Sequence, residues 1–140
     1  MNQVYNMYNQ IDISTSSPLK IVLMLYDGAI NFLNRAIQSA DEGDIKNKNI
    51  YANKALDIIN ELNNSLNTDV GEDLPKRLRS LYFFMSRHLM KANWKNDMKA
   101  MREVIDLLSN LREAWQYAYG QQEQEANHQN PRQMAAGMRI

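Results

Sequence analysis

Cysteine is absent from the 140-residue sequence, and proline and glycine are scarce, with three and five residues. Without cysteine the chain has no disulfides and no thiol chemistry, and it fits a reducing compartment. Scarce proline and glycine, among many leucine, isoleucine, alanine, lysine, glutamate and asparagine residues, favour helix throughout. The length predicts one domain with a substantial core.

Neither sign of charge dominates, and no long apolar run occurs. The 16 Lys and Arg residues balance the 16 Asp and Glu residues, which gives no indication of a nucleic-acid or anionic-membrane partner. The longest unbroken apolar run, residues 21–26, is far shorter than the roughly 20 residues of a membrane span. Residues 1–17 have neither the basic nor the apolar region of a signal peptide. We therefore expect a soluble, cytoplasmic helical domain.

Capping residues divide the chain into four helical segments. A helix can begin at Pro18, because the missing N–H of proline costs little in a first turn. Gly43 suits the end of that helix, and Asp44 can cap the next. Asn96 or Asp97 can cap the last helix. The predicted helices span residues 18–42, 45–67, 73–94 and 97–119.

Apolar residues recur every three or four positions in each predicted helix, which is the spacing of one buried face. In the first helix this face carries Leu19, Leu23, Tyr26, Ile30, Leu33 and Ile37, and in the second Ala52, Ala55, Ile59, Leu62 and Leu66. In the third it carries Leu74, Leu78, Leu81, Met85 and Ala92, and in the fourth Met101, Val104, Leu108, Leu111, Trp115 and Ala118. With short links, these faces predict an all-α, antiparallel up-and-down four-helix bundle over residues 18–120.

Two segments lie outside this pattern. Residues 1–17 form an N-terminal arm that is apolar for a tail and contains Tyr8, Ile11 and Ile13. Residues 121–140 are rich in glutamine and asparagine and show no apolar period. We expect the arm to act as a lid over an apolar patch of the bundle, and the tail to be disordered.

The first and third helices carry more apolar residues than one buried face needs. At about 100° per residue, Ile21, Leu25 and Phe32 lie about 130° from the centre of the core face of residues 18–42. In the third helix, a second apolar set lies nearly opposite the core face and consists of Phe83, Met90 and Trp94. Clustered exposed apolar side chains are typical of a partner surface. For Ile21 and Leu25 two interpretations stay open, because a neighbouring helix could equally cover them.

The stretch YNQIDISTSSPLKIVLMLYDGAINFLNRA, residues 8–36, resembles the N-terminal signature of the flagellin-specific export chaperones, the FliS family. In that family a tyrosine lies ten residues before a capping proline, and a helix reading LMLYDG follows; Tyr8, Pro18 and residues 23–28 match. The resemblance continues through KALDIINELNNSLN, GEDLPKRLRSLYFFMSRHLMKANWKND and EVIDLLSNLREAW, so it covers about residues 8–117. One departure is Phe84, where the family commonly has tyrosine.

This resemblance implies a four-helix bundle that binds the disordered C-terminal segment of newly made flagellin in the cytoplasm. It implies that the bundle keeps flagellin monomeric and, once loaded, meets the export gate of the flagellar type III secretion apparatus, without a cofactor or metal. The client would wrap around the bundle, and it stays open whether other flagellar regulators share the surface. The expected client contacts are Ile21, Leu25, Phe32, Phe83, Met90 and Trp94, and the expected lid residues are Tyr8, Ile11 and Ile13.

Candidates for catalysis are few. Residues 125–128, EANH, have the Glu-x-x-His spacing of di-iron bundles, but the motif occurs once and in the tail, so we expect no metal site. Residues 88–92, HLMKA, resemble the His-x-x-Lys-Gly motif of histidine phosphotransfer domains, which are also four-helix bundles. Ala92 replaces the glycine, and His88 lies near the core face, whereas a phosphoryl acceptor must be exposed. We therefore predict a protein that is not an enzyme, with phosphotransfer through His88 as the alternative.

Overall fold

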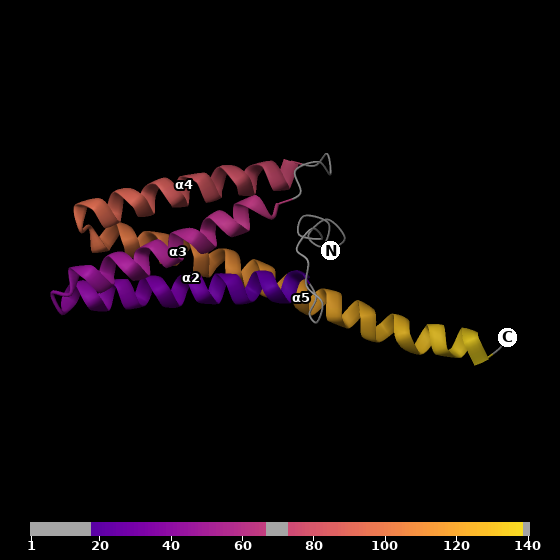
Figure 1. The fold of residues 1–140 in the computed structure, drawn as a ribbon. Helices are drawn as coiled ribbons and strands as arrows, with labels where there is room; N and C mark the ends of the chain where they lie inside the picture. The colour runs from indigo at the N-terminus through magenta and orange to yellow at the C-terminus, as the bar shows by residue number, and fades with distance from the viewer. Residues whose placement is uncertain (1–17, 67–72, 139–140) are drawn as a thin grey trace.

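The computed structural model describes residues 18–66 and 73–138, with side chains up to residue 125. These residues form the helices α2 (Pro18–Asp41), α3 (Ile45–Asn64), α4 (Asp73–Lys95) and α5 (Met98–Met138). Both α2 and α4 pack against α3 and α5, and consecutive helices run in opposite directions (Figure 1). The predicted all-α, antiparallel up-and-down bundle is therefore confirmed.

Local capping explains where the helices begin and end. Gly43 has a φ of 75° after the end of α2, a left-handed conformation that glycine adopts without strain. Asp44 caps α3 and Asp97 caps α5, each by accepting a hydrogen bond of 3.1 Å from the backbone N–H three residues further on. Of the two predicted caps for the last helix, Asp97 is thus the one used. Asn96, with a φ of 53°, instead takes the left-handed position after α4.

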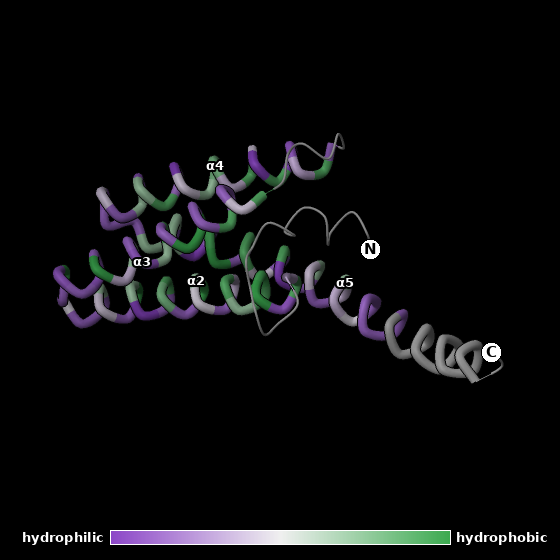
Figure 2. The backbone as a smooth tube through the Cα atoms, turned by 45° about the vertical axis from the view of Figure 1, so that its right-hand side comes forward, coloured by the Kyte–Doolittle hydropathy of each residue, from purple (hydrophilic) through white to green (hydrophobic). Residues whose placement is uncertain are grey.

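The buried faces of the four helices form one core. Hydrophobic and hydrophilic residues alternate along each helix (Figure 2), as expected when one face is buried and the other exposed. Every residue predicted for the core face of the second helix is buried. Leu74 was predicted in the core, and this is wrong, because its side chain is 37% exposed. It lies in the first turn of α4, where Pro75 and Leu78 take the inward positions.

Two tyrosines join α2 and α4, which lie diagonally across the bundle. The hydroxyls of Tyr26 and Tyr82 are 2.6 Å apart, and neither residue is accessible to solvent. Trp115 of α5 packs beside Tyr26, with 6.5 Å between the ring centroids. Each tyrosine thereby contributes a large apolar ring to the core and a partner for the other's hydroxyl. The periodicity placed Leu81 on the core face, but Tyr82 is the buried residue and Leu81 is only half-buried.

This tyrosine pair predicts a loss of stability at alkaline pH. Burial raises the pKa of Tyr26 well above its usual value of 10.0, and the nearby Tyr82 adds to the rise. Above about pH 10 the unfolded chain loses this proton while the folded chain keeps it, so the stabilising contribution is present below that pH and declines above it. In urea unfolding, Tyr26→Phe should lose less stability than wild type between about pH 8 and pH 11. The exposed control Tyr117→Phe should lose as much stability as wild type. If all three proteins lost the same amount of unfolding free energy, ionisation of Tyr26 would not be the cause.

The C-terminal segment differs from its expectation. The fourth helix was predicted to end near Gly120, but α5 continues to Met138. Glutamine, glutamate and alanine, which favour helix, fill much of the stretch after Gly120. The Tyr119 hydroxyl also donates a 2.8 Å hydrogen bond to Glu123 one turn on. The extension projects beyond the other three helices as a single helix (Figure 1).

Candidate docking surface

Phe83, Met90 and Trp94 form an apolar stripe along the outer face of α4, which we call the α4 stripe. Met90 and Trp94 follow Phe83 by seven and eleven residues. At about 100° per residue, each therefore lies within about 20° of Phe83 around the helix axis. The three side chains are 44%, 50% and 86% exposed. The prediction that they face away from the core is therefore confirmed. Their role in binding a client stays a prediction.

The predicted client contacts on α2 are less exposed than those of the α4 stripe. Ile21, Leu25 and Phe32 are all half-buried, and Leu25 and Phe32 pack against the core. Phe32 stacks on Tyr51 of α3, with 6.2 Å between the ring centroids. The Nζ atom of Lys54, also on α3, lies 5.4 Å from the centre of the Phe32 ring. Packing within the bundle thus covers part of the apolar surface of Leu25 and Phe32, and their role as client contacts stays a prediction.

Gly28 brings α2 close to α3. A Cβ at this position would lie 3.2 Å from Cδ1 of Ile58, which is tighter than ordinary van der Waals contact. The glycine of the LMLYDG motif therefore has a packing role between the two helices.

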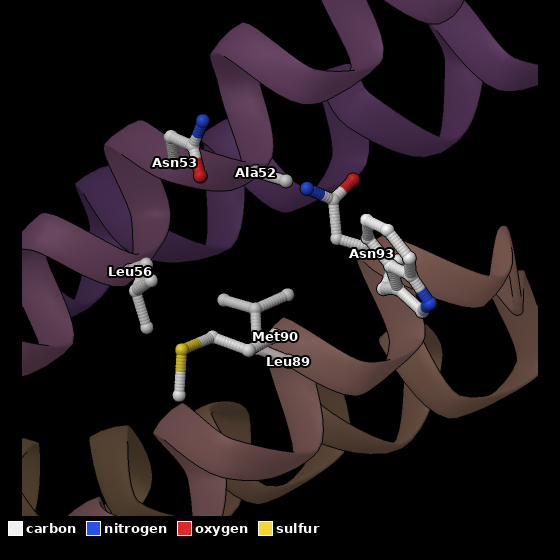
Figure 3. Close-up of a pocket in the computed structure, with 7 residues that line it drawn as sticks. Ala52, Asn53, Leu56, Leu89, Met90 and Asn93 are labelled. Atoms are coloured by element: carbon white, nitrogen blue, oxygen red, sulfur yellow. The ribbon is translucent and has the colours of Figure 1, made fainter.

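A groove runs between α3 and α4 beside the α4 stripe. One section, of about 120 Å³, is lined by Ala52, Asn53, Leu56, Leu89, Met90, Asn93 and Trp94. The next section, of about 410 Å³, is lined by Ile45, Lys48, Asn49, Asn53, Asn93, Trp94 and Asn96. Figure 3 shows Met90 of α4 extending toward Leu56 of α3 across the first section. Two residues of the α4 stripe thus border a concave site that presents apolar groups from both helices.

Sequence reasoning missed the α3 side of this groove. Leu56 is an apolar residue that lies outside the predicted core face of its helix, and this position could have indicated a second apolar contact surface. Asn49 and Asn53 precede it at helical spacing and add side-chain amides, which can donate and accept hydrogen bonds. On α4, the Oδ1 atom of Asn93 is buried and has no hydrogen-bond partner within the described part of the chain. The groove therefore offers polar groups as well as an apolar wall.

Lys48 fixes the end of α4 at this groove. Although it is a lysine, it is 1% exposed, and its ammonium group donates to the backbone oxygen of Asn93 (2.9 Å) and to Oδ1 of Asn96. Burial lowers the pKa of Lys48. A cation at the C-terminal end of a helix pairs favourably with the carbonyl groups that have no partner within the helix.

We predict that Lys48→Met lowers the free energy of unfolding by about 1–2 kcal/mol. The variant removes the donor of two hydrogen bonds and leaves the acceptor oxygens of Asn93 and Asn96 without it, and relief of the burial of the ammonium group offsets this loss only in part. Urea unfolding measures the difference, and Lys46→Met, at an exposed position of the same helix, is the control. If Lys48→Met proves as stable as the control, the aliphatic part of Lys48 stabilises the fold and its two hydrogen bonds add nothing.

Asp27 joins α2 to α5. Arg112 donates from Nε to Oδ1 of Asp27 and from Nη2 to Oδ2 at 3.3 Å. The hydrogen bond with Asp27 raises the pKa of Arg112. Because the two side chains are 48% and 35% exposed, solvent screens the pair and its contribution to stability is small. Its paired geometry mainly orients the two helices.

His88 is held by neighbours that do not suit a phosphoryl acceptor. Its Nε2 atom lies 2.9 Å from Oε2 of Glu103 on α5, and its ring stacks on Phe84 at 5.3 Å. A phosphoryl group on Nε2 would be placed against the Glu103 carboxylate, and the two negative charges would repel each other. The half-buried position near the core face agrees with its predicted position.

Groups that could bind a metal do not converge in the described residues. Within them, no set of three or more His, Asp or Glu side chains is placed to hold a metal ion. Glu125 is exposed, while the side chain of His128 lies outside the described part, as do the predicted lid residues Tyr8, Ile11 and Ile13. Among the helices of residues 18–66 and 73–138, none is long and apolar enough to cross a membrane.

Comparison with known proteins identifies the family. The model of a family described as "Flagellar protein FliS" matches residues 1–123. The flagellar secretion chaperone FliS of Bacillus subtilis (strain 168) is 36% identical over 114 residues, which cover 81% of this chain and 84% of that protein. The protein of the same name from Salmonella typhimurium (strain LT2) is 39% identical over 104 residues, covering 74% and 77%.

A solved structure supports the fold. A crystal structure described as a flagellar chaperone from bacteria superposes with a TM-score of 0.70 at 23% sequence identity, covering 86% of this chain and 98% of that one. The sequence relatives carry the assignment, because they match most of both chains. This chain belongs to the FliS family.

Proposed function

We propose that this protein is a cytoplasmic export chaperone that binds the disordered C-terminal segment of flagellin. In this proposal, binding prevents premature polymerisation, and the loaded bundle delivers flagellin to the flagellar export apparatus. Its relatives are named flagellar secretion chaperones, which supports the proposal. The structural observation that carries it is the exposed α4 stripe beside the groove between α3 and α4.

The energetics of the α4 stripe suit the binding of a disordered client. Burying an exposed large apolar side chain contributes roughly 1.5–3 kcal/mol. Phe83, Met90 and Trp94 are each 44% exposed or more, so a client could bury substantial apolar surface on all three. Ordering a disordered segment costs about 2–5 kcal/mol or more. Several such contacts therefore exceed the ordering cost, and Ile21, Leu25 and Phe32 would add to them where the client passes α2.

Polymerisation of purified flagellin tests the proposal. With an equimolar amount of this protein, light scattering of seeded flagellin should stay low, because the segment needed for polymer contacts is occupied. A flagellin that lacks its C-terminal segment should fail to co-elute with the protein in gel filtration. Unchanged polymerisation together with separate elution of full-length flagellin would contradict the proposed function.

The N-terminal arm is proposed as a lid on the client surface, through Tyr8, Ile11 and Ile13. These apolar side chains would be displaced or newly covered when flagellin binds. We expect hydrogen exchange in residues 4–16 to change on addition of a C-terminal flagellin peptide, measured by mass spectrometry. A peptide from the middle of flagellin is the control. Identical exchange in the free and bound protein would show that the arm takes no part.

A further inference from the structure

Positive charge is concentrated on α4, although the whole chain is neutral. Six basic residues stand on this helix against one acidic residue, Asp73: they are Lys76, Arg77, Arg79, Arg87, Lys91 and Lys95. All six basic side chains are exposed. Acidic residues that balance them in the total charge therefore lie on other parts of the chain.

These cations surround the α4 stripe. At about 100° per residue, Lys76, Arg79 and Arg87 lie within about 40° of Phe83 on the helix surface. The guanidinium carbon of Arg79 is 5.5 Å from the centre of the Phe83 ring, a cation–π contact that brings charge directly over the apolar stripe. Charge and apolar surface thus share one face of α4.

The basic residues of α4 have no acidic partners within residues 18–66 and 73–125. The contacts between basic and acidic side chains found there join His88 to Glu103 and Arg112 to Asp27. Arg87, Lys91 and Lys95 follow one another at four-residue intervals, and like charges at that spacing destabilise a helix. An acidic partner would relieve this repulsion while it covers the apolar side chains.

We infer that the α4 face selects an acidic amphipathic segment, one whose apolar side chains cover Phe83, Met90 and Trp94 and whose carboxylates meet the flanking lysines and arginines. This inference rests on the proposed function, and it names the chemistry of the flagellin stretch that docks on α4. Complementary charge accelerates association and fixes orientation, while the apolar contacts hold the complex together. Nucleic acid would satisfy the cations, but its phosphate backbone would leave the aliphatic contacts of the groove unused.

Association kinetics test the inference with a charge-matched pair of variants. Arg79→Gln/Arg87→Gln/Lys91→Gln removes three charges from the α4 face, and Lys46→Gln/Lys99→Gln/Arg102→Gln removes three from exposed positions on α3 and α5. Stopped-flow mixing with a C-terminal flagellin peptide at about 50 mM salt should show association about 10-fold slower for the first variant. Its affinity should also depend less on salt. The second variant should stay within about twofold of wild type.

Two designed peptides separate this inference from the proposed function. Both carry the same leucine and alanine positions, flanked by glutamate in one and lysine in the other, and binding is read from the fluorescence of the exposed Trp94. Tighter binding of the glutamate peptide by about 10-fold or more supports the inference even if flagellin does not bind.

Flagellin binding with equal kinetics for both charge variants, and equal affinity for both peptides, would overturn the inference and leave the proposed function standing. A 20-nucleotide single-stranded DNA that binds more tightly than the glutamate peptide, and only with the α4 cations intact, would also overturn it, because the face would then be a general polyanion site.

Discussion

Leu108→Ala should lower the free energy of unfolding by about 2–5 kcal/mol, and Trp115→Ala by about 3–5 kcal/mol. Leu108 is 0% exposed and Trp115 is 5% exposed, and both lie on the inner face of α5. Truncation removes buried apolar contacts and leaves a cavity that the surrounding helices fill only in part. Urea unfolding followed by circular dichroism measures the loss.

Leu74→Ala is the matched control for the core prediction. It removes the same atoms as Leu108→Ala, but from a side chain that is 37% exposed in the first turn of α4. We expect a loss of about 1 kcal/mol. If Leu108→Ala cost no more than Leu74→Ala, residues 98–119 would not pack as described.

Serine substitutions on the α4 stripe should weaken client binding without lowering stability, unlike the core substitutions. Phe83→Ser and Trp94→Ser should each weaken binding of a C-terminal flagellin peptide by about 1–3 kcal/mol, the range of interface hot spots. The melting temperature should stay unchanged or rise slightly, because each variant removes exposed apolar surface and serine has a helix propensity close to that of phenylalanine and tryptophan.

Tyr117→Ser is the control for the stripe variants. Tyr117 is a large aromatic residue, 70% exposed, but it lies on α5, outside the α4 stripe. Its replacement should leave both binding and melting temperature unchanged. Stripe variants that melt like core variants and bind normally would show that Phe83 and Trp94 stabilise the fold rather than contact a client.

The helices could be predicted because their signals are local. Gly43 and Asp44 mark a helix end and a helix start through backbone conformation and a single side-chain hydrogen bond, both within a few residues. The three- to four-residue apolar period likewise depends only on helix geometry. The end of α5 was missed because Gly120 was taken as a stop, whereas the helix-forming residues after it continue the helix and Pro131 lies within α5.

Pairing between helices was harder to predict. The hydrogen bond between Tyr26 and Tyr82 joins residues 56 positions apart, and nothing in the local pattern of either helix specifies it. The outward direction of Phe83 and Trp94 followed from the helical period alone. By contrast, the burial of Phe32 depends on Tyr51 of α3, and the groove wall at Leu56 depends on how α3 and α4 lie together. These features require the packed structure.

Calorimetric titration of a C-terminal flagellin peptide into the wild type and into Phe83→Ser/Met90→Ser/Trp94→Ser tests the central claim most directly. We expect the wild type to bind one peptide per chain, and the triple variant to fold with an unchanged melting temperature while its affinity falls by at least about 100-fold. Wild-type affinity in the folded triple variant would contradict the claim that the α4 stripe is the client-binding surface.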